Sequence, residues 1–158
     1  MSGTVVLYVT RSGHAKVLAE DVAQRSGTKA LEIGDLVGRK GLWGFIKTGA
    51  QAGRNLATPI RDPEAALGPA SIIVLVQPVW ANAVCPPLRT WLQKHKAELA
   101  GKRLGLLCSN KGSPGEALRA KYESEFGQLA SFAVIQETKE AGEKSAMLDS
   151  FLAKLNKA

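Results

Sequence analysis

The sequence predicts a doubly wound α/β domain, in which helices cover both faces of a mostly parallel sheet. Four near-continuous apolar runs, rich in β-branched residues, lie at 5–9, 71–77, 103–109 and 131–137. Such runs are typical of strands that are buried on both faces. Segments with the apolar spacing of amphipathic helices separate them. This alternation of strands and helices favours the doubly wound class.

The remaining elements follow from weaker patterns. A run at 28–33 is a fifth predicted strand, and it suits the edge of the sheet. Four helices are predicted from apolar residues with 3/4 spacing, at 15–23, 88–99, 118–126 and 148–155. The second predicted helix follows a Pro-Pro pair, which suits a first helical turn. The last predicted helix has lysines near its end, where their charge interacts favourably with the helix dipole.

The long connection at 34–70 is the one irregular stretch. It contains GLWGFIKTGAQAG, whose glycines and aromatic residues fit either a short amphipathic helix or a loop that folds over a site. We expect a partly helical excursion here. Trp43 and Phe45 would pack in the core or contact a ligand.

The length of 158 residues is that of one ordinary domain, so a single domain over 1–158 is expected. No apolar run approaches a membrane span and no secretion signal is apparent, which predicts a cytoplasmic location. The two cysteines have no metal-ligand spacing, and both are expected to be free thiols. Cys85 precedes a predicted helix start, where it is either a packed thiol or a redox thiol whose pKa the helix dipole lowers.

The formal net charge is +7, from 21 basic and 14 acidic side chains. Such a balance favours anionic partners, from phosphorylated ligands to nucleic acid. Nucleic acid is the less favoured of these, because aromatic residues are few and no basic recognition helix is apparent. A local excess of basic residues lies in the long connection and is either a solvated surface or an anion-docking one: Arg39, Lys40, Lys47, Arg54 and Arg61.

Three segments leave predicted strand ends: Thr10–Lys16, Pro78–Cys85 and Ser109–Gly115. In open α/β sheets, ligands bind at the carboxyl ends of the strands, so these segments should meet at one site. The first has hydroxyls and a glycine before a helix, as a phosphate cradle requires. A simple helix N-cap by Ser12 needs the same residues.

The other two segments carry groups suited to a flat ligand. Trp80 follows a buried strand and can stack on a planar ring or pack on the next helix, and Asn82 tolerates a strained turn. The third segment, SNKGSPGE, is polar and glycine-rich, and Ser113 with Glu116 would form a capping box.

Three stretches resemble the flavodoxin family. VVLYVTRSGHAKVLAEDVA resembles its phosphate loop with the flanking strand and helix, and QPVWANAVCPPLRTWLQKH and LGLLCSNKGSPGE resemble its two flavin-flanking loops. GLWGFIKTGAQAG is also similar to a segment of some flavodoxin-like proteins. The resemblance implies a flavodoxin-like three-layer sandwich, with a five-stranded parallel sheet in the order 2-1-3-4-5 and flavin mononucleotide (FMN) at the switch point.

The resemblance also implies a set of cofactor-binding residues. The residues around the ribityl phosphate would be Thr10, Arg11, Ser12, Gly13, His14 and Ala15. Those along the isoalloxazine ring would be Pro78, Val79, Trp80, Ala81 and Asn82, with Ser109, Asn110 and Gly112 near its pyrimidine side. Ala15 stands where the family usually has a hydroxyl, so His14 or Lys16 would supply charge instead. Metal ligands are not implied.

The leading functional hypothesis is an FMN-binding redox protein that moves electrons between a reductant and a protein or small-molecule acceptor. The alternative is an NAD(P)H-dependent, FMN-containing quinone or flavin reductase, which would suit the basic surface and whose two-electron hydride chemistry needs no stable radical. No catalytic acid or base stands out, and the basic charge predicts a redox partner with an anionic surface. A phosphate-receiving regulator would need acidic residues where Thr10 and Gln77 stand, and a flavin-free module for nucleic acid is the third possibility.

Overall fold

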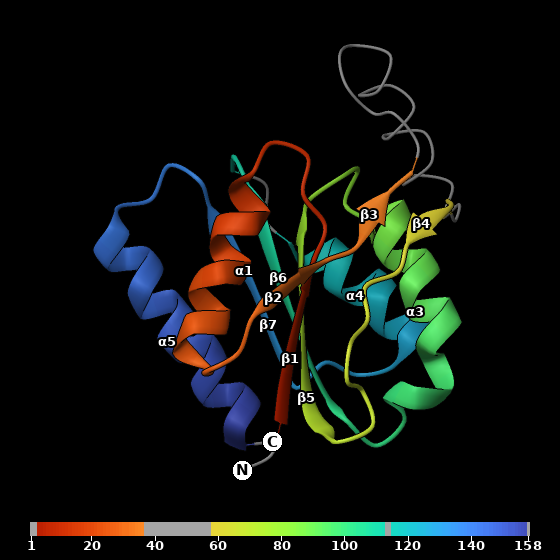
Figure 1. The fold of residues 1–158 in the computed structure, drawn as a ribbon. Coiled ribbons are helices and arrows are strands. Elements are labelled where there is room, and N and C mark those ends of the chain that lie inside the picture. Colours follow the sequence, from red (N-terminus) through yellow and green to blue (C-terminus); the bar gives the residue numbers. More distant parts are fainter. Residues whose placement is uncertain (1–2, 37–57, 113–114, 158) are drawn as a thin grey trace.

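The computed structural model describes residues 3–36, 58–112 and 115–157. Its main feature is a five-stranded sheet in the order β2-β1-β5-β6-β7, in which every neighbouring pair is parallel (Figure 1). The strands are β1 (Gly3–Tyr8), β2 (Ala30–Glu32), β5 (Ala70–Pro78), β6 (Arg103–Asn110) and β7 (Ser131–Gln136). Counted along the chain within this sheet, this is the predicted order 2-1-3-4-5, which is confirmed.

Within the described residues, four helices cover the two faces of the sheet. They are α1 (His14–Arg25), α3 (Pro86–Leu99), α4 (Glu116–Phe126) and α5 (Ala141–Lys157), and each overlaps a predicted helix. Helices α1 and α5 lie on one face, and α3 and α4 lie on the other (Figure 1). Two buried clusters separate these layers, so the three-layer sandwich is confirmed.

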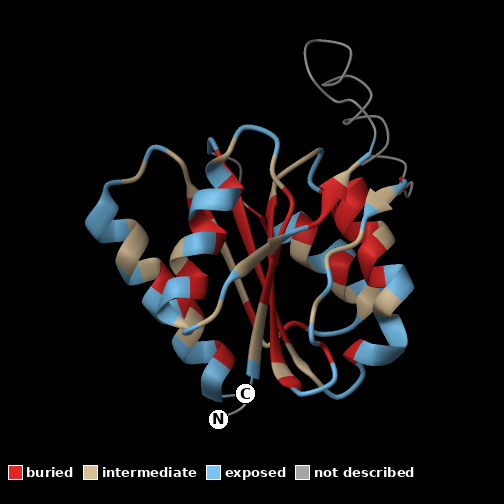
Figure 2. Ribbon diagram, viewed as in Figure 1, coloured by how far each residue is buried: buried red, intermediate tan, exposed pale blue. Residues whose placement is uncertain are grey.

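The central strand β5 supplies both clusters. Ile73 and Leu75 face the α3–α4 core, whereas Val74 and Val76 face the α1–α5 core. All four are fully buried. The centre of the sheet is coloured as buried in Figure 2. Because both faces of β5 are covered, its sequence is continuously apolar instead of alternating. Its one buried polar side chain, Gln77, lies near its carboxyl end.

A small antiparallel pair, β3 (Gly34–Asp35) with β4 (Ile60–Arg61), flanks the long connection. The sequence did not predict it, because strands of two residues carry no readable periodicity. Strand β2 has only three residues and lies at the edge, as expected. The partly helical excursion, with Trp43 and Phe45, falls within 37–57, outside the described residues.

Cys85 and Cys108 are free and fully buried, as predicted for free thiols. Burial, and next the neighbouring Cys85, raise the pKa of the Cys108 thiol well above its ordinary value. A thiol held protonated in this way is a poor nucleophile. Within the described ranges, no helix is long and apolar enough to cross a membrane.

Candidate functional site

The carboxyl ends of β1, β5 and β6 lie side by side at one edge of the sheet (Figure 1). Backbone hydrogen bonds continue the pairing past the strand ends: the Val9 N–H donates to the Val76 carbonyl at 2.9 Å, and the Val79 N–H donates to the Ser109 carbonyl at 3.0 Å. The segments that leave these three strands therefore begin next to one another. This is the edge where open α/β sheets bind their ligands.

Helix α1 begins without a side-chain cap. Its N-cap residue is Gly13, which has a φ of 97°, and no side chain caps the helix. The Ser12 hydroxyl instead lies 2.8 Å from His14 Nδ1, so the interpretation of Ser12 as the N-cap is wrong. The left-handed Gly13 turns the chain so that its own N–H donates to Thr10 Oγ1 at 2.9 Å. The N–H groups of the first helical turn are then available for an anion.

Two carboxylates lie close to basic side chains at this helix end. His14 is half-exposed, and its Nδ1 lies 3.5 Å from Oε1 of Glu137, a carboxylate that is only 16% exposed. Lys16 forms an exposed pair with Glu20 at 3.8 Å. Ala15 is buried in the α1–α5 core. Its small apolar side chain therefore packs inward.

A hollow of about 550 Å³ lies at the ends of β5 and β6. It brings together five of the predicted residues and two that the sequence analysis missed: Pro78, Val79, Ser109, Asn110 and Gly112, with Lys111 and Glu137. Its volume lies within the range of about 300–1,000 Å³ that is usual for small-molecule sites.

Two polar residues, Ser109 and Asn110, line this hollow. The Ser109 hydroxyl is buried and has no hydrogen-bond partner among the described residues. The Asn110 side chain accepts a hydrogen bond from the Gly112 N–H at 3.1 Å, which fixes the start of the loop. A buried hydroxyl without a partner is costly, so Ser109 marks a place where a ligand atom would be favourable.

Glu137 connects the hollow to the beginning of α1. A smaller hollow of about 150 Å³ shares Ser109 and Glu137 and is also lined by His14. The Glu137 N–H donates to the Asn110 carbonyl at 2.8 Å, and its carbonyl accepts from Lys144 Nζ at 2.7 Å. Its backbone is thereby fixed on both sides. Extending the strand-end argument to the last predicted strand would have identified it, since it follows β7 directly.

The segment after β5 forms a tight turn. The Ala83 N–H donates to the Trp80 carbonyl at 3.1 Å, and Ala81 and Asn82 both have a φ of 50°. Positive φ at both central residues is the pattern of a type I′ turn. Asn82, a residue type that tolerates such a conformation, occupies the second of these positions. Trp80 packs against the α3–α4 core, and Trp80, Ala81 and Asn82 do not line the hollow, so their contact with a ring stays a prediction.

Helix α4 has Gly115 as its N-cap, and no side chain of the described residues caps it. The expected capping box includes Ser113, which lies outside the described residues. Cys85 precedes α3 as predicted, but its thiol is fully buried. Groups of three or more His, Cys, Asp or Glu that could hold a metal do not occur in the described part of the chain.

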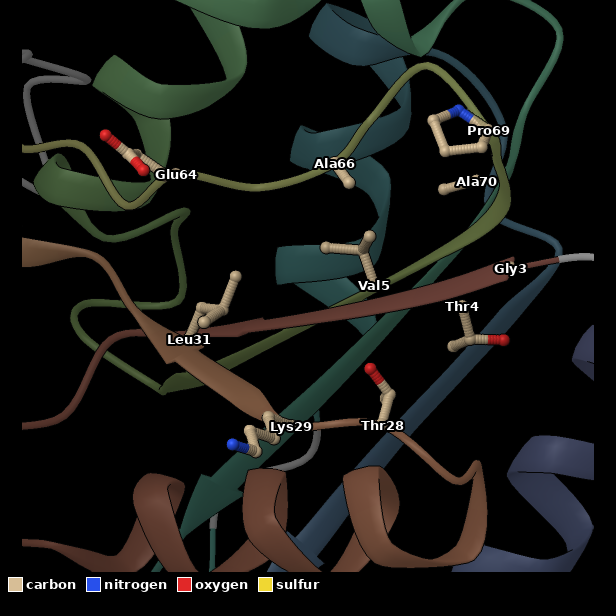
Figure 3. A pocket seen from close by; sticks show the side chains of 10 residues that line it. All are labelled: Gly3, Thr4, Val5, Thr28, Lys29, Leu31, Glu64, Ala66, Pro69 and Ala70. Atoms are coloured by element: carbon tan, nitrogen blue, oxygen red, sulfur yellow. The ribbon is translucent and has the colours of Figure 1, made fainter.

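A second groove, of about 440 Å³, lies near the opposite ends of β1 and β2 (Figure 3). Val5 and Leu31 form its centre, and its charged side chains, Lys29 and Glu64, lie on opposite sides. None of the predicted site residues lines it. Because its polar groups do not converge and it lies away from the carboxyl ends of the strands, it is the weaker candidate.

No family model and no curated protein matches the sequence. Solved structures do match. A flavoprotein in complex with FMN from Lactobacillus acidophilus has 18% identity and a TM-score of 0.70, over 93% of this chain and 99% of that one. A short-chain flavodoxin associated with a bacterial microcompartment has 20% identity and a TM-score of 0.58, over 99% and 98%.

An NADH:FMN oxidoreductase also matches, with 13% identity and a TM-score of 0.61, over 98% of this chain and 89% of that one. At such identities the likeness concerns the arrangement of the backbone. Together with the strand order and the helices on both faces, it shows that this chain has the flavodoxin-like fold.

Proposed function

We propose that this protein binds FMN at the carboxyl edge of its sheet and carries electrons between a reductant and a protein or small-molecule acceptor. One observation carries the proposal: an uncapped helix N-terminus and a ligand-sized hollow lie at the ends of adjacent parallel strands. FMN has a phosphate at one end and a flat ring at the other, and these two features fit its two ends.

The phosphate end would be held by the start of α1. The N–H groups of its first turn and the helix dipole favour an anion, and the hydroxyls of Thr10 and Ser12 are next to them. Gly13 leaves open space, since a Cβ at this position would meet no atom within 4 Å. His14 adds an imidazole at the same end, which would donate to a phosphate oxygen. Arg11 belongs to the same segment.

The ring end would be held by the hollow beside β5 and β6. Pro78 and Val79 supply apolar surface, while Asn110 and the unpartnered hydroxyl of Ser109 supply polar atoms for the edge of the ring. Bound FMN supplies reversible one- or two-electron chemistry. The protein's part is to bind the ring, orient it and set its electrostatic surroundings.

The test is a titration of the purified protein with FMN and, in parallel, with riboflavin, which lacks the phosphate. We expect FMN to bind at micromolar concentration or tighter, and riboflavin to bind at least about tenfold more weakly because it does not engage α1. Quenching of flavin fluorescence measures both. Absence of FMN binding at about 100 µM would overturn the proposal.

A reductase is the second candidate, favoured by the likeness to an NADH:FMN oxidoreductase and by the formal charge of +7, which suits an anionic dinucleotide. Anaerobic reduction of the FMN-loaded protein separates the two functions. Rapid reduction by NADH or NADPH supports the reductase. Reduction only by an artificial one-electron donor, with half-reduced flavin accumulating, supports the carrier.

The positive net charge also suggests which kind of redox partner the protein would bind. A carrier with 21 basic and 14 acidic side chains would dock on an anionic surface of its redox partner. Electron transfer to such a partner should slow as the salt concentration rises, because screening weakens the attraction. A rate that does not depend on ionic strength would argue against an anionic partner.

A further inference from the structure

Gln77 is a fully buried amide near the end of the central strand β5. The side chains before it, from Ile72 to Val76, are apolar and buried on both faces of the sheet. A buried amide is costly unless it is hydrogen-bonded, and an apolar residue would be the ordinary choice in such a strand. The hydrogen bonds of Gln77 explain why a polar residue can be buried at this position.

The Gln77 side chain binds the backbone of the following segment at three points. Its Nε2 donates to the carbonyl of Pro78 and to that of Ala83, both at 3.1 Å. Its Oε1 accepts from the N–H of Cys85 at 3.0 Å. One side chain thus joins the beginning of the segment Pro78–Cys85 to its end, and all its polar atoms are satisfied.

The segment that Gln77 closes contains the strained turn. Ala81 and Asn82 both lie in the left-handed region, which costs roughly 1–2 kcal/mol for a non-glycine residue. Such a conformation persists only where surrounding contacts determine it. Besides the Gln77 contacts, the backbone hydrogen bonds of this segment include one within the turn, from the Ala83 N–H to the Trp80 carbonyl, and one at each end: the Val79 N–H donates to Ser109, and the Cys85 carbonyl accepts from Arg89.

We infer that Gln77 is a positioning residue, which fixes the segment Pro78–Cys85 in its ligand-ready conformation before a flavin binds. The inference rests on the proposed function, because Pro78 and Val79 form one wall of the hollow assigned to the ring. A wall that is already ordered does not lose conformational freedom on binding, so affinity for the ring is higher. The phosphate end, at α1, does not depend on this segment.

The test compares the wild-type protein with Gln77→Met, which keeps the side-chain length and removes the hydrogen bonds. In the variant we expect FMN and riboflavin to bind about tenfold more weakly, by the same factor, because both contain the ring. Inorganic phosphate should compete with FMN at an unchanged inhibition constant. A general loss of stability would not separate ring from phosphate in this way.

The matched control is Ser131→Ala. Ser131 is also buried, and its hydroxyl donates to the Phe151 carbonyl at 2.9 Å, but it lies at the beginning of β7, away from the site. This variant should lower the unfolding temperature without changing either flavin affinity. If both variants weaken flavin binding alike, the effect comes from stability and the inference is wrong.

A measurement without ligand separates this inference from the proposed function. Hydrogen exchange of the free protein should be at least about tenfold faster at the Ala83 and Cys85 amides in Gln77→Met, while β6 stays protected. Faster exchange in a protein that binds no flavin would support the positioning role and refute the cofactor. Unchanged exchange, with unchanged flavin affinities, would refute the role of Gln77.

Discussion

Replacing Ala81 with glycine should stabilise this protein, although most Ala-to-Gly changes destabilise. Ala81 has a φ of 50° and is exposed, so the change removes left-handed strain and no packing. Relief of the strain contributes roughly 1–2 kcal/mol, and the greater freedom of glycine in the unfolded chain offsets about 0.4–1 kcal/mol. The midpoints of these two ranges leave a net gain of about 0.8 kcal/mol, which for a chain of this size raises the unfolding temperature by roughly 2–3 °C.

The control is the same chemical change in a helix. Ala153 is exposed in the interior of α5, where Ala→Gly should cost roughly 1 kcal/mol and lower the unfolding temperature by about 2–4 °C. Thermal unfolding followed by circular dichroism measures both variants. If Ala81→Gly lowers the unfolding temperature as much as Ala153→Gly, the turn does not hold Ala81 in the left-handed region, and the argument from strain fails.

Three further predictions concern charge. His14→Ala should weaken FMN binding about three- to tenfold and leave riboflavin unchanged; equal losses for the two ligands would remove His14 from the phosphate end. Glu137→Gln should strengthen FMN binding by a similar factor, because the carboxylate repels a phosphate, and weaker binding would contradict this. Burial alone would raise the pKa of Asp62, but hydrogen bonds from Lys94 and His95 bring this pKa below its usual 3.8. Because this pKa is lower in the folded than in the unfolded protein, the ionised carboxylate stabilises the fold above about pH 3.8. That contribution to stability is lost as the pH falls below this value. In urea unfolding between pH 6 and 3, Asp62→Asn should therefore lose less stability than the wild-type protein; parallel pH profiles would refute this contribution.

The buried strands and the helix layers could be predicted because burial on both faces makes strands continuously apolar, as at Ile73 and Val74. The strand order was implied only by the resemblance to the flavodoxin family. The short pair β3–β4 could not be predicted, since two residues carry no period. Helix ends were less predictable for another reason. Ser12 is a typical N-cap residue type, but Gly13, in a left-handed conformation, takes the N-cap position. The sequence shows that a glycine can adopt this conformation, not that it does.

The place of the hollow was predictable from the strand ends. Ser109 and Asn110 at the end of β6, and Gly112 just after it, line the hollow because the parallel sheet brings such ends together. Their contact with a flavin stays a prediction. Gln77 was noted only as a residue that is not acidic. Its role depends on which carbonyls and N–H groups the turn after β5 places within reach, and only a three-dimensional structure gives these contacts.

Different structural features form the two ends of the candidate site, so substitutions should affect the two ends separately. The phosphate end depends on the backbone of α1 and the conformation of Gly13, which tolerate many neighbouring side chains. The ring end depends on one buried amide, whose loss removes one hydrogen bond from the Ala83 carbonyl and one from the Cys85 N–H. Changes at Gln77 should therefore alter recognition of the ring while recognition of the phosphate persists. In such variants, ligands that share only the phosphate with FMN would gain relative to riboflavin.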